Sequence, residues 1–201
     1  FFHMLPIVCA LFAYSVKSGK SAQKRQTHSQ GKPTKLRMTL RPSRGAQGVT
    51  TAELLWDQAP QTCQAIVDSC PFTTIAWHGR NSGAEALLVT PNVIRHVPQD
   101  SSENATTDHK KGMIAFGLEL AGQQVGGAGA ADVSEIAWFY GEACQANFWV
   151  SERGYPHTVG PYRRQPASIN HFAQVVEDAG FYDVSQNLIH LGDTEIFVEV
   201  L

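Results

Sequence analysis

The chain has 201 residues, of which 43% are hydrophobic and 17% are charged. This composition is typical of one soluble globular domain with a sizeable core, and the length argues against two domains. The formal net charge of −2 gives no reason to expect nucleic acid as a partner. The apolar run at residues 5–16 is too short to span a bilayer, so we expect no stable membrane span.

The N-terminal part of the chain divides into two segments ahead of the folded domain. Residues 1–16 are an apolar arm, whose first three residues, ahead of Met4, we interpret as a cloning remnant. This arm is either a signal-peptide core or a segment that packs on the domain or on a second copy. An arm exchanged between two copies would suit a homodimer. Residues 17–34 are polar and basic, as in a flexible linker.

The four cysteines bear on both location and metal binding. They form no CxxC pair and match no zinc-type histidine spacing, so we expect no metal centre. Reduced, buried thiols favour a cytoplasmic protein, whereas a signal peptide at residues 5–16 would make it secretory. We expect no cofactor.

The folded domain is predicted over residues 35–201 and begins with a β-hairpin. Leu36, Met38 and Leu40 alternate with polar residues, which predicts a half-buried strand. A second strand over residues 49–56 completes the hairpin. Asp57 is placed to cap a following helix that ends before Pro71.

Short strands continue along most of the remaining chain. We expect strands at residues 72–78, 84–90, 112–120, 134–140, 147–151 and 196–200. Residues 91–111 read as a long loop and residues 122–131 as a mobile flap. A second helix is predicted at residues 167–179, with Gly180 just after its end. Many short strands with two helices and no βαβ alternation predict a mainly β fold, a closed β-barrel.

The densest group of polar residues is the stretch Trp77-His78-Gly79-Arg80-Asn81-Ser82-Gly83-Ala84-Glu85. Arg80 suits a substrate carboxylate, because its planar guanidinium binds both oxygens; a surface ion pair is the alternative. His78 is a candidate acid or base, or a barrel histidine bonded to a backbone carbonyl. Ser82 either binds a substrate oxygen or shapes the turn. Glu85 either orients His78 or pairs with Arg80, and Trp77 is a candidate substrate contact.

A second candidate group lies at the end of the strand predicted at residues 134–140. Tyr140 and Glu142 are expected on one face by strand parity, with Trp138 nearby. An apolar mouth would raise the pKa of Glu142 and make it a general base, with Tyr140 orienting the intermediate and Trp138 contacting substrate. An exposed glutamate in a turn is the alternative.

Two motifs resemble known families. The segment Ala52-Glu53-Leu54-Leu55-Trp56-Asp57-Gln58-Ala59-Pro60-Gln61-Thr62 resembles the opening of cyclophilins. The spacing of His78, Arg80, Ser82 and Gly83, followed later by Trp138-Phe139-Tyr140-Gly141-Glu142, is similar to cyclophilin-like proteins with a His-x-Arg-x-Ser-Gly motif. Those proteins are similar in turn to the cucumopine and mikimopine synthases, which join histidine to 2-oxoglutarate by Pictet–Spengler cyclisation.

The resemblance covers roughly residues 35–201. It implies a closed cyclophilin-like barrel and a cofactor-independent cyclase or lyase that condenses an amine or amino acid with a carbonyl or carboxylated compound. In this interpretation His78, Tyr140 and Glu142 are catalytic, while Arg80 and Ser82 bind substrate oxygens. The Phe-Met-x-Gln-Gly-Gly-Asp run of cyclophilins has no counterpart. A prolyl-isomerising or peptide-binding module, and a non-catalytic acid-binding protein, are the alternatives.

Overall fold

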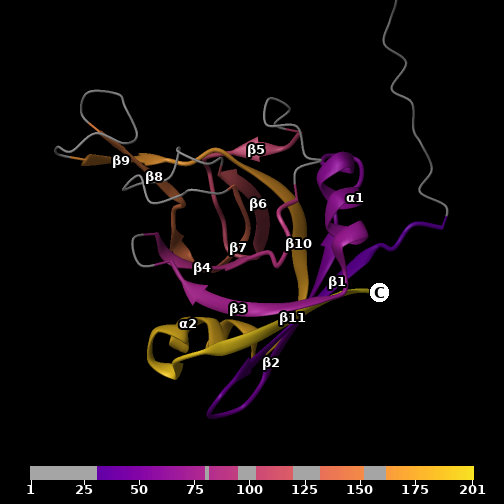
Figure 1. Ribbon diagram of the computed structural model, residues 1–201, viewed down its shortest axis with the longest axis vertical. Helices are drawn as coiled ribbons and strands as arrows, with labels where there is room; N and C mark the ends of the chain where they lie inside the picture. The colour runs from indigo at the N-terminus through magenta and orange to yellow at the C-terminus, as the bar shows by residue number, and fades with distance from the viewer. Residues whose placement is uncertain (1–30, 80–81, 95–102, 120–131, 152–161) are drawn as a thin grey trace, which may run out of the picture. The chain divides into compact units, whose positions relative to one another are not determined.

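The computed structural model describes residues 31–79, 82–94, 103–119, 132–151 and 162–201 (Figure 1). Residues from Gly31 to Leu201 belong to one compact unit. The predicted N-terminal arm, most of the predicted linker and the predicted flap lie outside the described residues.

The described chain is mainly β, as predicted. Its elements are β1 (Lys35–Pro42), β2 (Gly48–Leu54), α1 (Pro60–Ser69), β3 (Phe72–His78), β4 (Gly83–Val89), β5 (Ala105–Thr106), β6 (Met113–Glu119), β7 (Val133–Cys144), β8 (Asn147–Ser151), β9 (Tyr162–Pro166), β10 (Ile169–Ala179), α2 (Phe181–Leu191) and β11 (Thr194–Val200). Every predicted strand is found, with shifts at its ends. Neither described helix is long and apolar enough to cross a membrane.

Eight strands close into an antiparallel barrel, which confirms the predicted fold class. Their order is β2-β1-β11-β3-β4-β7-β6-β10, and pairing between β10 and β2 closes the ring. β5 pairs with the first two residues of β10, Ile169 and Asn170, while β8 and β9 form a separate two-stranded sheet. Closure pairs the edge strands with each other, so the barrel itself leaves no free edge.

Alternating apolar residues fill the barrel. Leu36, Met38 and Leu40 of β1 have no exposed surface, as the alternation in the sequence predicts. Ile66 of α1 and Phe181 of α2 are equally buried and belong to the same core cluster. Burying each such side chain contributes about 1.5–3 kcal/mol, so this single cluster is the main source of stability.

The start of α1 departs from the prediction. The helix and the proline in its first turn are confirmed, but Asp57 does not cap it. The carboxylate of Glu103 accepts hydrogen bonds from the backbone N–H groups of Gln61 and Thr62, both at 2.8 Å. A residue some forty positions away therefore supplies the cap, and local sequence carries no signal of it.

The helix predicted at residues 167–179 is wrong, because this segment forms β10. Its pairing shifts register between His171 and Ala173 on the β6 side, and between Val175 and Glu177 on the β2 side. Each shift inserts an extra residue and breaks the period-2 alternation, so the apolar positions mimic a helical spacing. Gly180, with φ of 77°, precedes helix α2 instead of ending a helix.

Candidate functional site

The hairpin of β3 and β4 divides the predicted site residues between two faces of the sheet. Across the strands, Ala86 pairs with both His78 and Trp138, so these three side chains share the inner face of the barrel. Glu85 pairs with Phe139 on the outer face, since neighbouring residues of a strand point to opposite sides. Glu85 and His78 therefore lie on opposite faces of the sheet, and the pairing of Glu85 with Arg80 stays a prediction.

The outer face holds a buried carboxyl group. Glu85 is 5% exposed, and the Ser82 hydroxyl donates a hydrogen bond to it. Gly79 fits closely against it, because a Cβ at Gly79 would lie 3.0 Å from Glu85 Oε2. Burial raises the pKa of Glu85 from 4.5 to about 7, an effect that the Ser82 hydrogen bond opposes. This carboxyl group can therefore accept and return a proton near neutral pH.

Aromatic and sulfur groups surround this carboxyl group. Phe139, the cross-strand neighbour of Glu85, is fully buried, and the ring of His109 stacks on it with centroids 4.7 Å apart. The thiol of Cys144 donates to the backbone oxygen of His109 at 3.6 Å. Burial raises the pKa of Cys144, and the negative charge of Glu85 adds to this effect. Cys144 thus lies near both Glu85 and the His109 segment.

His109 is a candidate that sequence reasoning missed. It is 6% exposed, and its Nε2 lies 3.1 Å from the oxygen of Ala167. A carbonyl oxygen only accepts, so Nε2 carries the hydrogen and Nδ1 is left as an acceptor. That Nδ1 is buried and has no hydrogen-bond partner in the described part of the chain. Burial lowers the pKa of His109, which keeps its ring neutral at pH 7.

The inner face brings together two predicted catalytic residues. His78 Nε2 lies 2.6 Å from the Tyr140 hydroxyl, and both side chains are partly buried. Burial lowers the pKa of His78 and raises the pKa of Tyr140. Both groups are therefore neutral at pH 7, joined by one hydrogen bond.

Trp77 and Trp138 have contrasting positions. Trp77 is 55% exposed on the outer side of β3. Trp138 is fully buried in the core, where its Nε1–H donates to Ser185 Oγ at 2.8 Å and its ring packs against Phe181. Trp138 thus packs in the core, with no exposed surface for a substrate to contact.

No described contact joins Glu142 or Arg80 to the group around Glu85 or to the pair of His78 and Tyr140. Glu142 is exposed, in a part of β7 where the pairing with β4 skips from Phe139 to Cys144. Strand parity from Tyr140 does not carry through this irregular stretch. Arg80 lies outside the described residues. Within the described ranges, no three His, Cys, Asp or Glu side chains gather in a group that could hold a metal.

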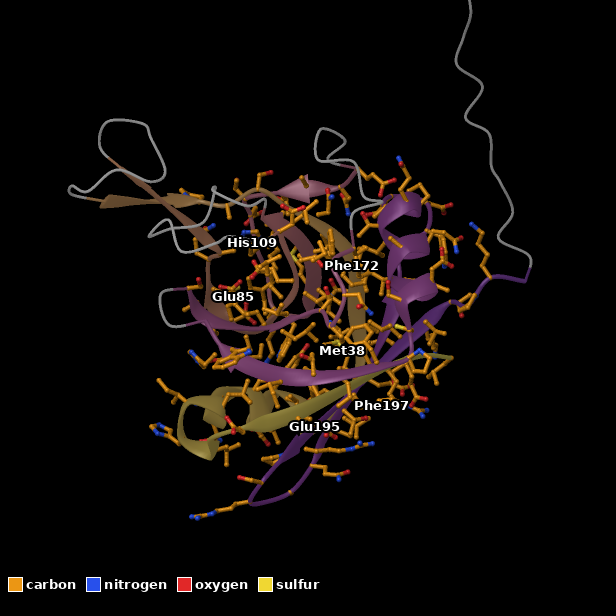
Figure 2. All side chains as sticks on the ribbon, viewed as in Figure 1. Met38, Glu85, His109, Phe172, Glu195 and Phe197 are labelled. Carbon is orange, nitrogen blue, oxygen red and sulfur yellow. The ribbon has the colours of Figure 1, made fainter. Side chains whose placement is uncertain are left out.

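Figure 2 shows Glu85 and His109 on the side of the view opposite helix α1, whereas Met38 and Phe172 lie within the barrel. Glu85 pairs across the strands with Phe139 and His109 stacks on the same ring, so both groups lie on the Phe139 side of the sheet. They border a second, smaller apolar cluster that contains Met113, Ala115, Ala137, Phe139, Ala146, Ala167 and Ile169.

The family DUF3830, described as a protein of unknown function, matches residues 42–150. This is more than half of the chain, and the protein belongs to that family. Among curated proteins there is no match.

Two solved structures are similar at low identity. One is the hypothetical protein AF2241 from Archaeoglobus fulgidus, with 17% identity and a TM-score of 0.43, covering 85% of this chain and 98% of that one. The other is McbB in complex with tryptophan, with 11% identity and a TM-score of 0.47. That match covers 81% of this chain and 44% of McbB.

Proposed function

We propose that the protein is a small-molecule enzyme that joins an amine to a carbonyl compound in a Pictet–Spengler-type condensation, with Glu85 as the proton-transfer group. The observation that carries the proposal is the 5% exposed carboxyl group whose pKa is raised to about 7. The reaction class is supported by the resemblance of residues 78–83 and 138–142 to the cyclophilin-like opine cyclases.

The proposed reaction needs one base that works near neutral pH. The amine nitrogen attacks the carbonyl carbon and water leaves, which gives an imine. The imine nitrogen takes a proton from water, and a ring carbon of the amine partner attacks the resulting iminium carbon. That ring carbon then loses its proton to the Glu85 carboxylate. Glu85 returns the proton to water. The atoms balance as two substrates giving one product and one water, with no oxidant or reductant.

Glu85 suits this step better than His78 does. Burial moves the pKa of the carboxyl group up to neutrality, whereas burial moves the pKa of His78 below its usual value of 6.5. Proton transfer is most effective when the pKa of the base lies near the working pH. The hydroxyl of Ser82 fixes the carboxyl group, and a fixed base lowers the entropic barrier.

One further residue keeps its proposed role beside this group. Trp77, exposed on the outer side of β3, would contact an aromatic amine. The proposed site therefore lies on the outer face of β3 and β4.

The test is a turnover screen by mass spectrometry. The protein is incubated with pooled histidine and tryptophan derivatives as amines, and with pooled 2-oxo acids and aldehydes. We expect a product at the summed mass less one water. Glu85→Gln should lower kcat by about 10²–10⁴-fold, the usual worth of a general base. Tyr140→Phe, which changes the inner face, is the matched control and should keep turnover.

Each result of this screen has a separate meaning. Wild-type turnover by Glu85→Gln would overturn the assignment of the base. Absence of any condensation product from the folded wild-type protein would overturn the reaction class. Binding of an acid without turnover would instead favour the non-catalytic acid-binding protein.

A further inference from the structure

Two buried acceptors of hydrogen bonds lie on the outer face. The first is Glu85, whose carboxyl group takes a hydrogen bond from Ser82 and has further oxygen lone pairs. The second is His109 Nδ1, which the hydrogen bond from Nε2 to Ala167 fixes as an acceptor. More than nine-tenths of each side chain is buried, and Nδ1 has no partner among the described residues.

A buried acceptor without a donor is costly in a folded protein, and native structures rarely retain one without a reason. The Ala167 hydrogen bond fixes which nitrogen faces which way, because a turn of the ring that exchanged its two nitrogens would break this bond. A donor from outside the described chain would satisfy Nδ1. Among the described residues, the Ser82 hydroxyl and the Cys144 thiol already have acceptors, so this part of the site offers acceptors and no spare donor, which specifies the chemistry of its ligand.

We propose that His109 is a substrate-binding residue, and that His109 Nδ1 and the Glu85 carboxylate together bind the amine substrate through its N–H groups. This inference rests on the proposed function and names which substrate the outer face selects. A primary ammonium has three N–H donors, enough for both acceptors, and its charge complements the carboxylate. A carboxylate ligand would instead place its lone pairs against both acceptors.

Binding of the ammonium also prepares Glu85 for its role. A positive charge beside Glu85 lowers its pKa and favours the carboxylate. The ammonium gives one proton to Glu85 before its nitrogen attacks the carbonyl carbon. Glu85 returns that proton to water, so its carboxylate is free again when the ring proton must be removed. The same residue therefore first holds the amine and then takes the ring proton.

The test compares two probes of matched size, 2-phenylethylamine and 3-phenylpropionate, by isothermal calorimetry at pH 7.5. We expect the amine to bind and the acid to bind at least tenfold more weakly. His109→Gln retains an amide N–H that can reach the Ala167 oxygen but has no acceptor at the Nδ1 position. It should weaken binding of the amine about tenfold, which corresponds to about 1.4 kcal/mol.

The matched control is His171→Gln. His171 Nε2 also lies against a backbone oxygen, that of Ala173 at 2.9 Å, and burial also lowers its pKa. This variant should bind 2-phenylethylamine as the wild-type protein does. Equal weakening in both variants, or equal affinity of the wild-type protein for the acid and the amine, would overturn the proposal.

A measurement on the unchanged protein keeps the proposal testable if His109→Gln does not fold. The ¹⁵N resonance of His109 Nδ1 should move on saturation with 2-phenylethylamine, as an unbonded nitrogen becomes an acceptor, while those of His171 stay in place. An unmoved Nδ1 resonance would contradict the inference. Amine binding without turnover would support this inference while the condensation fails. Normal turnover with an unchanged KM in His109→Gln would overturn this inference while the condensation reaction stands.

Discussion

The inner and outer faces of the sheet formed by β3, β4 and β7 show how one physical cause gives two chemical outcomes. On the inner face, burial lowers the pKa of His78 and raises that of Tyr140, so both groups are uncharged at neutral pH. On the outer face, burial raises the pKa of Glu85 to about 7. Loss of water always disfavours the charged form, and only the carboxyl group starts from a pKa that this shift brings to neutrality.

The difference between the two faces predicts separate roles for the inner hydrogen bond and the outer carboxyl group. The inner pair shares one hydrogen bond beside the main core, with His78 Nδ1 buried and without a partner among the described residues. The outer carboxyl group is buried and keeps its proton to a higher pH than in water. Stability should therefore depend on pH through Glu85, and the inner hydrogen bond should contribute to stability without affecting turnover.

The largest expected effect is on the pH dependence of stability. The folded protein holds the proton of Glu85 up to about pH 7, whereas the unfolded chain releases it near pH 4.5. The folded state therefore binds more protons between these values, and the free energy of unfolding falls as pH rises through them. The loss above pH 7 is about 3 kcal/mol. Glu85→Gln should not show this loss of unfolding free energy.

Urea denaturation at pH 4.5 and at pH 8 measures this effect. The stability of Glu85→Gln relative to wild type should rise by about 3 kcal/mol between the two values. Buried histidines, His78, His109 and His171, act in the opposite direction below their unfolded pKa of 6.5, but they are present in both proteins and cancel. A difference between the two proteins that does not change with pH would show that Glu85 titrates as an exposed glutamate.

A smaller effect is expected on the inner face. Tyr140→Phe removes the hydroxyl that bonds to His78 Nε2 and leaves the ring in place. The free energy of unfolding should fall by about 1 kcal/mol, the usual worth of one such hydrogen bond. With the substrates that the turnover screen identifies, kcat should stay close to wild type. A fall in kcat as large as that of Glu85→Gln would move the catalytic centre to the inner face.

Much of the fold could be predicted from the sequence because most strands keep a regular alternation. Leu36, Met38 and Leu40 show it plainly, and β1 forms as expected. The prediction fails where the pairing is irregular. Register shifts in β10 hide its period, and the cap of α1 comes from Glu103, a residue that only the folded chain brings there.

The candidate site could be predicted only in part. The residues of the 77–85 stretch were found by their chemistry, but the bend between β3 and β4 resets the parity, so the sequence could not tell that His78 and Glu85 face opposite ways. His109 has no local signal, since it lies among charged residues of a predicted loop. Its burial arises from the stack on Phe139 and the hydrogen bond to Ala167, which are both tertiary contacts.

The central claim is that Glu85 holds its proton near neutral pH, and ¹³C NMR of the glutamate side-chain carboxyl groups tests it without any substrate. In the wild-type protein, one glutamate resonance should titrate near pH 7, and this resonance should be missing from the spectrum of Glu85→Gln. If every glutamate of the wild-type protein titrates near the ordinary value of about 4.3, the outer face holds no base for neutral pH and the account is contradicted.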